Sequence, residues 1–303
     1  MKKIHRRRLA GCLLAFAAWP AFAALREEES NLPVGVLASD GSRVVQDIRV
    51  TTWSDDANPR PAPIVVLNHG RLSTAAERQA MPRARYSQAA AFFVGRGFIV
   101  VVPTRLGYGA GGGPDVENPG SCDAPDFARG ADAAAEQIAQ ALAAARRRPD
   151  AAQDRAVVVG HSFGGLATLD MVSRRPAGVQ AFVNFAGGAG GNAKDRPRQP
   201  CAMDRLQAQI RHYGETSRIP SLWIYAENDD YFGTEHPQEW LAAYREAGGQ
   251  GEFIQAPPVA EPGHLYFNRA VADWVPGVGA FLDAQGFQET PHAGGNGARA
   301  ADK

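Results

Sequence analysis

The segment "RAVVVGHSFGGLATLDMV", residues Arg155 to Val172, combines a strand pattern, a serine flanked by glycines and a helix pattern. β-Branched residues precede the serine and an apolar run follows it, which is typical of a buried strand leading into a helix. Glycine inside such elements costs about 0.5–1 kcal/mol relative to alanine, so its use around Ser162 needs a reason. One reason would be a tight packing turn. The other is the pattern G-x-S-x-G, in which a sharp strand-to-helix turn exposes a nucleophilic serine. We predict the second.

Short apolar segments alternate with helical patterns along the rest of the chain. This alternation predicts a single α/β domain, a mostly parallel sheet flanked by helices, without a large lid insertion. In such a sheet, ligands bind at the carboxyl ends of the strands, where Ser162 would lie. The expected strands are 43–50, 63–68, 98–103, 156–160, 181–186, 221–226 and 252–256, and the expected helices are 85–94, 131–147, 163–174, 202–213, 237–247 and 273–284.

A serine hydroxyl needs a base to become nucleophilic, and the base needs an acid to orient it. Enzymes with this turn carry the three residues in the chain order serine, acid, histidine. Of the histidines after Ser162, only His264 follows the last expected strand in an irregular loop, next to Gly263. The others are His212, His236 and His292, of which the first two lie in or before helical segments and the third lies in the tail.

Three carboxylates directly follow the expected strand 221–226, where the acid of such a site belongs: Glu227, Asp229 and Asp230. We favour Asp229, with Asp230 as the main alternative. Acyl transfer also needs hydrogen-bond donors for the oxyanion, one from the residue after the nucleophile and one from a loop after an earlier strand. These predict the backbone N–H groups of Phe163 and Arg71.

The first 23 residues have the layout of a secretory signal peptide: a basic start, an apolar run and the small-residue site Ala21-Phe22-Ala23. The apolar run is too short to span a bilayer comfortably, which takes about 20 residues. Cleavage would leave 27 basic and 32 acidic residues, a net charge of −5, with no basic stripe for nucleic acid. We expect a hydrolase domain over 24–287, a disordered tail over 288–303, and a periplasmic or secreted location.

Two cysteines, Cys122 and Cys201, remain after the predicted cleavage, both in loop-like surroundings rich in proline and glycine. In an oxidising compartment an even pair favours a disulfide. Neither cysteine has a CxxC or nearby histidine partner, so no metal site is expected.

Four segments in this order resemble the α/β-hydrolase superfamily: "NHGR", "GHSFGG", "YAENDD" and "PGHLYF". Within it, the chain is similar to the dienelactone-hydrolase-like group and the bacterial cutinase-like esterases. The resemblance covers about residues 31–287 and implies that the aspartate of the "END" turn, Asp229, is the acid. True dienelactone hydrolases carry a cysteine at the place of Ser162, so the resemblance does not imply lactone opening.

The sequence therefore predicts an exported serine hydrolase that cleaves small-molecule carboxylic esters, without cofactor, metal, nucleic-acid partner or membrane span. A serine peptidase or amidase of the same fold is the first alternative, and a non-catalytic binding protein on this scaffold is the second. The stretch "GYGAGGGPD" contains G-x-G-x-x-G but is followed by helix breakers, so we interpret it as a flexible rim of the site rather than a dinucleotide-binding turn. The acyl group and the oligomeric state are left open.

Overall fold

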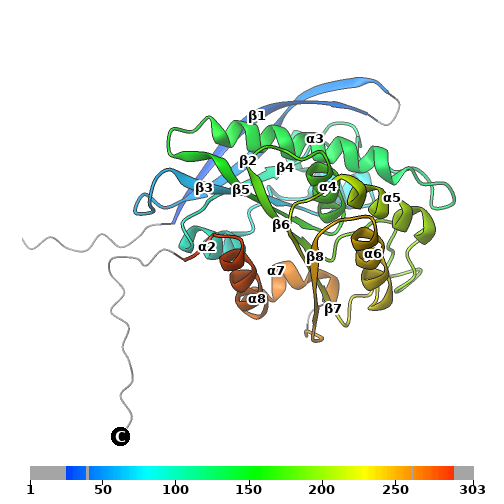
Figure 1. Ribbon diagram of the computed structural model, residues 1–303. Coiled ribbons are helices and arrows are strands. Elements are labelled where there is room, and N and C mark those ends of the chain that lie inside the picture. The colour runs from blue at the N-terminus through cyan, green and yellow to red at the C-terminus, as the bar shows by residue number, and fades with distance from the viewer. Residues whose placement is uncertain (1–24, 39–40, 261, 290–303) are drawn as a thin grey trace, which may run out of the picture.

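The computed structural model of the chain describes residues 25–38, 41–260 and 262–289. The expected signal peptide and nearly all of the expected tail lie outside these residues. One eight-stranded sheet forms the centre, in the order β1-β2-β4-β3-β5-β6-β7-β8 (Figure 1). β2 pairs antiparallel with both β1 and β4, and all other neighbours are parallel. The strands are β1 (Arg26–Leu37), β2 (Arg43–Ser54), β3 (Ala62–Asn68), β4 (Ile99–Thr104), β5 (Ala151–His161), β6 (Val179–Phe185), β7 (Ser221–Ala226) and β8 (Gly251–Ala256).

Helices cover both faces of the sheet, in two separate groups (Figure 1). Four helices pack on one face: α3 (Phe127–Arg146), α4 (Phe163–Ser173), α5 (Met203–Thr216) and α6 (Glu235–Glu246). The other face carries α2 (Ser87–Gly95), α7 (Tyr266–Arg269) and α8 (Val271–Ala284), and the short α1 (Ala75–Ala80) follows β3.

The apolar run of β3 shows why the central strands are continuously hydrophobic. Successive side chains of a strand point to opposite faces, so a strand covered on both sides needs apolar residues at every position. Ile64 and Val66 join the core under α3 and α4, whereas Val65 and Leu67 join the core under α2 and α8. All four are fully buried.

The predicted fold class is confirmed: the sheet is mostly parallel, helices flank it, and only α5 lies between β6 and β7. β1 was not among the strands expected from the sequence. Its sequence, "REEESNLPVGVL", begins with polar residues only and includes Pro33, and the strand lies at the edge of the sheet, where proline is tolerated and one side faces solvent.

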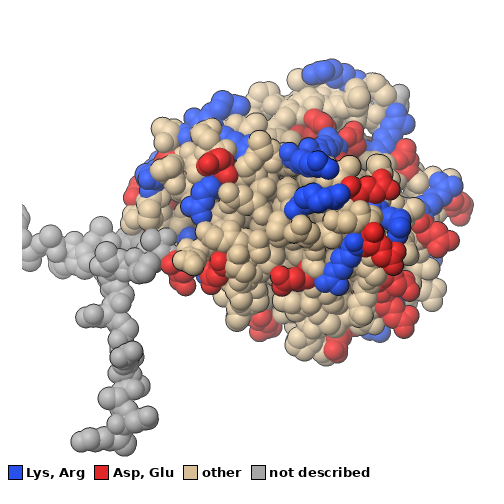
Figure 2. Space-filling view, viewed as in Figure 1, with Lys and Arg blue, Asp and Glu red and all other residues tan. Residues whose placement is uncertain are grey.

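Basic and acidic side chains lie close together over the face of the molecule shown in Figure 2. Within the described part of the chain, no helix combines the length and the apolar character needed to cross a membrane.

Candidate active site

Ser162 lies on the turn between β5 and α4 in a backbone conformation that is unusual for an L-residue, with φ 55° and ψ −125°. Such conformations cost about 1–3 kcal/mol and persist only where the surroundings hold them. Here the N–H of Ser162 donates to the carbonyl of Phe185 at 2.9 Å. The carbonyl of Ser162 accepts from the N–H groups of Gly165 at 2.8 Å and Gly188 at 3.1 Å. Bonds to the neighbouring strand and the following loop therefore fix the turn.

The glycines around Ser162 are required by close approach of other backbone. A Cβ atom on Gly160 would lie 2.2 Å from the carbonyl oxygen of Gly164, and one on Gly164 would lie 2.4 Å from that of His69. A Cβ on Gly165 would lie 2.3 Å from Oδ1 of Asn184. The same glycines thus permit the tight turn and bring α4 against the loop after β3. They therefore serve packing as well as the exposure of Ser162, and the two interpretations of the motif do not exclude each other.

The structure brings Ser162, His264 and Asp229 together in one hydrogen-bonded chain. Nε2 of His264 lies 2.9 Å from Oγ of Ser162, and its Nδ1 lies 3.1 and 3.2 Å from the two carboxylate oxygens of Asp229. Asp229 is fully buried. The alternative acid, Asp230, points outward: its side chain is 54% exposed and lies 3.7 Å from Nε of Arg198.

The turn after β7 holds both Asp229 and the ring of His264. Oδ1 of Asp229 accepts from the backbone N–H groups of Tyr231 at 2.7 Å and Phe232 at 3.2 Å. The ring of Tyr231 stacks on the imidazole with centroids 4.0 Å apart, and Phe232 meets it edge-on at 5.3 Å. A Cβ on Gly263 would lie 2.5 Å from the carbonyl carbon of Asn228, so only glycine lets the histidine loop approach this turn.

The two backbone groups expected to hold the oxyanion flank Ser162. Phe163 is the first residue of α4, where N–H groups have no partner within the helix. Arg71 follows Gly70, on which a Cβ would lie 3.0 Å from Cβ of Ser162. Within residues 25–38, 41–260 and 262–289, neither N–H meets a hydrogen-bond acceptor. Neither group is therefore engaged by another part of the described chain.

A fully buried ion pair, which the sequence analysis missed, supports the loop that carries Arg71. Nε of Arg105 donates to Glu117 at 2.5 Å, and its Nη1 donates to the carbonyl oxygen of His69 at 2.7 Å. The hydroxyl of Tyr108 donates to the same carboxylate at 2.9 Å. Burial alone would lower the pKa of Arg105, but the Glu117 carboxylate outweighs it and raises the pKa above its ordinary value. The guanidinium therefore stays charged and holds the loop through its hydrogen bond to the carbonyl oxygen of His69.

His69 is a structural part of this loop. Its Nδ1 lies 2.7 Å from the carbonyl of Gly70, and its Nε2 accepts from the N–H of Arg105 at 3.0 Å. Burial, and then the charge of Arg105, hold the pKa of His69 well below 6.5. The ring is therefore neutral, with its proton on Nδ1.

A cleft of about 770 Å³ opens over Ser162 and His264. It is lined by the loop after β3, by the segment that leads into α2 and the start of that helix, and by η2 (Gly263–Leu265) together with α7. Four arginines and no carboxylate line it: Arg71, Arg83, Arg85 and Arg269. Apolar side chains such as Met81, Tyr86 and Phe267 complete the wall.

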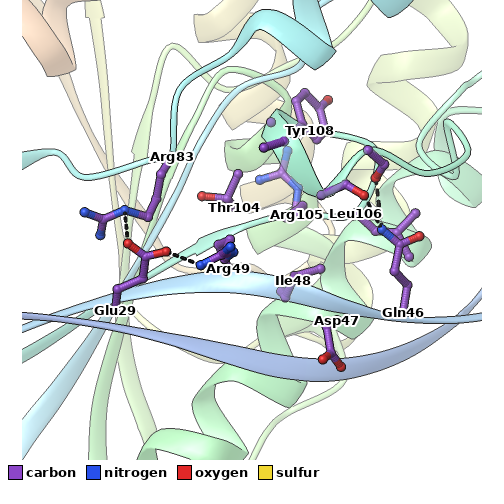
Figure 3. A pocket seen from close by; sticks show the side chains of 14 residues that line it. Glu29, Gln46, Asp47, Ile48, Arg49, Arg83, Thr104, Arg105, Leu106 and Tyr108 are labelled. Carbon is purple, nitrogen blue, oxygen red and sulfur yellow. Dashed lines mark hydrogen bonds and ion pairs between the residues drawn. The ribbon is translucent and has the colours of Figure 1, made fainter.

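The glycine-rich loop lines a different cavity, so its interpretation as a rim of the active site is wrong. This second cavity, of about 210 Å³, lies between β2 and residues 104–112 (Figure 3). Gln46 donates to the carbonyls of Gly111 and Gly112, and Glu29 pairs with Arg83 and Arg49 at the other end (Figure 3). These bonds tie the loop to β2.

Cys122 and Cys201 form a disulfide with their Cα atoms 5.5 Å apart. It joins the loop before α3 to the loop before α5. In the described part of the chain, no group of three or more His, Cys, Asp or Glu side chains could hold a metal ion.

Comparison with solved structures identifies the fold. An esterase from Pyrococcus furiosus superposes with a TM-score of 0.53 at 15% identity, covering 84% of this chain and 91% of the esterase. A dienelactone hydrolase from Klebsiella pneumoniae gives 0.54 at 15% identity, covering 86% and 99%. This chain has the α/β-hydrolase fold. The acylaminoacyl peptidase of Pyrococcus horikoshii also matches, with a TM-score of 0.58 at 12% identity, but the match covers 88% of this chain and only 43% of the peptidase. No protein-family model and no curated protein sequence matches the chain.

Proposed function

We propose that the protein is a serine hydrolase that cleaves carboxylic esters through an acyl-enzyme. The observation that carries this proposal is the hydrogen-bonded chain from Ser162 through His264 to Asp229, beside two unpaired backbone donors. Nucleophile, base and orienting acid in such contact are the requirement for serine catalysis of acyl transfer. The cleft over Ser162 provides room for a small-molecule substrate.

In the proposed mechanism Oγ of Ser162 attacks the ester carbonyl carbon while Nε2 of His264 takes its proton. The N–H groups of Arg71 and Phe163 donate to the oxyanion of the tetrahedral intermediate. Asp229 holds the proton on Nδ1 of the imidazole and stabilises the imidazolium that forms. His264 then gives the proton to the leaving alkoxide, and the alcohol departs. Water, activated by the same histidine, attacks the acyl-enzyme and releases the acid.

A serine peptidase remains the alternative within the same chemistry, since one structural neighbour is an acylaminoacyl peptidase. The small-molecule proposal is preferred because the nearly full-length neighbours are an esterase and a dienelactone hydrolase. We further propose that the protein acts after export, in the periplasm or outside the cell, where the Cys122–Cys201 disulfide persists.

A fluorophosphonate probe tests the proposal directly. We expect labelling at Ser162, located by peptide mapping, together with turnover of short-chain aryl esters. Ser162→Ala should abolish labelling and lower kcat by a factor of about 10⁶ without unfolding the protein. Turnover of aryl amides or peptides at a rate comparable with esters would favour the peptidase. A folded protein with neither labelling nor turnover would be a binding protein on a hydrolase scaffold.

A further inference from the structure

His161, the last residue of β5, lies at the floor of the cleft directly before Ser162. Its side chain is on the face of the sheet covered by α7, with its ring 5.2 Å from that of His264 and 6.1 Å from that of Phe267. Only 5% of the residue is exposed. The proposed mechanism uses neither of its nitrogens, although the residue is the chain neighbour of Ser162 and its ring lies beside that of His264.

The hydrogen bond of His161 fixes its tautomer. Nε2 lies 2.7 Å from the backbone carbonyl oxygen of His264, and a carbonyl oxygen can only accept. Nε2 therefore carries the proton. Burial, and then the nearby charge of His264, lower the pKa of His161 to about 4, so the ring takes up no second proton near neutral pH. Nδ1 is then a bare nitrogen with a lone pair.

Nδ1 belongs to a residue that lines the cleft. Nδ1 has no hydrogen-bond partner among the described residues, and it is not one of the buried polar atoms that lack both a partner and solvent. His161 lines the cleft beside Ser162, so the cleft is the route by which a ligand would reach this nitrogen. The cleft is also lined by Arg71, Gln88 and Asn268, so its wall can receive a polar group.

We propose that Nδ1 of His161 accepts a hydrogen bond from the substrate, and that the preferred substrates are carboxylic esters bearing a hydroxyl within two carbons of the ester group. This inference rests on the proposed ester hydrolysis. An alkyl group placed against Nδ1 would displace water and leave the nitrogen unpaired, whereas a hydroxyl would replace the water's hydrogen bond. A site that holds a hydrogen bond for a hydroxyl discriminates against the analogue that lacks it.

The test uses esters that differ only by hydroxyl against methyl. Aryl 3-hydroxybutyrate is compared with aryl 3-methylbutyrate for the acyl side, and 2-hydroxyethyl butyrate with propyl butyrate for the alcohol side. One neutral hydrogen bond predicts a preference of about fivefold to tenfold in kcat/KM for the hydroxylated member of at least one pair. Turnover of all four esters without preference would overturn the inference but leave the proposed function intact. Absence of any turnover and of probe labelling at Ser162 would refute the proposed function itself.

Two substitutions separate binding of substrate from support of His264. In His161→Gln the side-chain amide nitrogen can take the place of Nε2, but nothing replaces Nδ1. In His161→Asn the amide oxygen can take the place of Nδ1, but the bond to the carbonyl of His264 is lost. We expect the hydroxyl preference to fall to about one in the Gln variant. In the Asn variant we expect it to persist while kcat falls on both members of the pair.

His212→Gln is the matched control, because His212 is an exposed histidine whose partner is Glu215. It should keep the wild-type preference. A Gln variant of His161 that retained the preference would overturn the assignment of Nδ1. Equal loss of preference in the Gln and Asn variants would also overturn it, because the effect would then come from a displaced His264.

Discussion

Replacing Glu117 by Gln should destabilise the protein strongly, because it removes the only carboxylate that contacts the buried guanidinium of Arg105 in the described structure. Both side chains are 0% exposed. One carboxylate oxygen accepts from Nε of Arg105, and the other accepts from Nη2 of Arg105 and the hydroxyl of Tyr108. The Gln side chain has a single acceptor oxygen. Its NH₂ group would therefore face other donors, either Nε of Arg105 or the pair formed by Nη2 of Arg105 and the hydroxyl of Tyr108.

The expected loss follows from this geometry. Removing one partner of a buried ion pair costs about 3–5 kcal/mol, because an uncompensated charge stays buried. Gln retains one hydrogen bond, so we expect the lower end, about 3 kcal/mol in the free energy of unfolding. For a domain of this size this corresponds to a fall in Tm of about 6–12 °C. Ester turnover should fall about tenfold or more, because Arg105 also holds the carbonyl of His69 in the loop that presents Arg71.

Urea unfolding followed by tryptophan fluorescence measures the loss, with the slope m checked for constancy. Glu246→Gln is the control: Glu246 pairs with Arg211 at 2.8 Å, but the side chains are 68% and 50% exposed. That change should stay within about 0.5 kcal/mol. A loss below about 1 kcal/mol for Glu117→Gln, at unchanged m, would show that the pair does not stabilise the loop as argued. The double variant Arg105→Met/Glu117→Met should lose less than Glu117→Gln, since no charge is left buried.

Three further predictions concern the acid, a buried histidine and the disulfide. Asp229→Asn should lower kcat about 10⁴-fold whereas Asp230→Asn stays within about threefold; the reverse ranking in steady-state kinetics would reassign the acid. An unfolded histidine binds its proton near pH 6.5 and folded His161 only near pH 4, so the stability due to this residue is complete above pH 6.5 and falls as the pH drops. Between pH 6.5 and 5 the loss should be about 2 kcal/mol by urea unfolding, and His161→Gln should remove that part of the pH dependence. Non-reducing mass analysis should find Cys122 linked to Cys201, and two alkylatable thiols would refute the bridge. Reduction should lower the free energy of unfolding by about 4 kcal/mol, since the bridge joins residues that are 79 positions apart in the sequence.

Much of the fold could be predicted because its elements have strong local patterns. β7 has the expected bounds, 221–226, and α4 ends one residue before the expected end. β1 could not be found, since an edge strand with one face in solvent needs no apolar run and the first half of its sequence is entirely polar. Its strand character comes from pairing with β2, which a local pattern does not show.

The candidate site likewise has one part that the sequence predicts and another part that it does not. The residues placed together by the structure, Ser162, Asp229 and His264, each follow a strand, and parallel strands bring their carboxyl ends to one edge. The support of the oxyanion loop depends instead on Arg105 and Glu117, twelve positions apart with a glycine-rich loop between them. Nothing in the local sequence distinguishes this buried pair from two solvated charges. The same glycine-rich loop was also expected to form the rim of the active site, whereas it lines the second cavity.

The position of the disulfide has a consequence for how the molecule responds to proteolysis. The bridge closes a covalent ring from residue 122 to residue 201, which contains Ser162 and the strands β5 and β6. Asp229 and His264 lie outside the ring, on the chain that leaves it. A single cut inside the ring therefore leaves one covalently joined molecule, which separates into two fragments only after reduction. A cut between residues 202 and 228 leaves the segment that carries both partners of the serine without any covalent link to it, so one broken bond has different consequences inside and outside the ring.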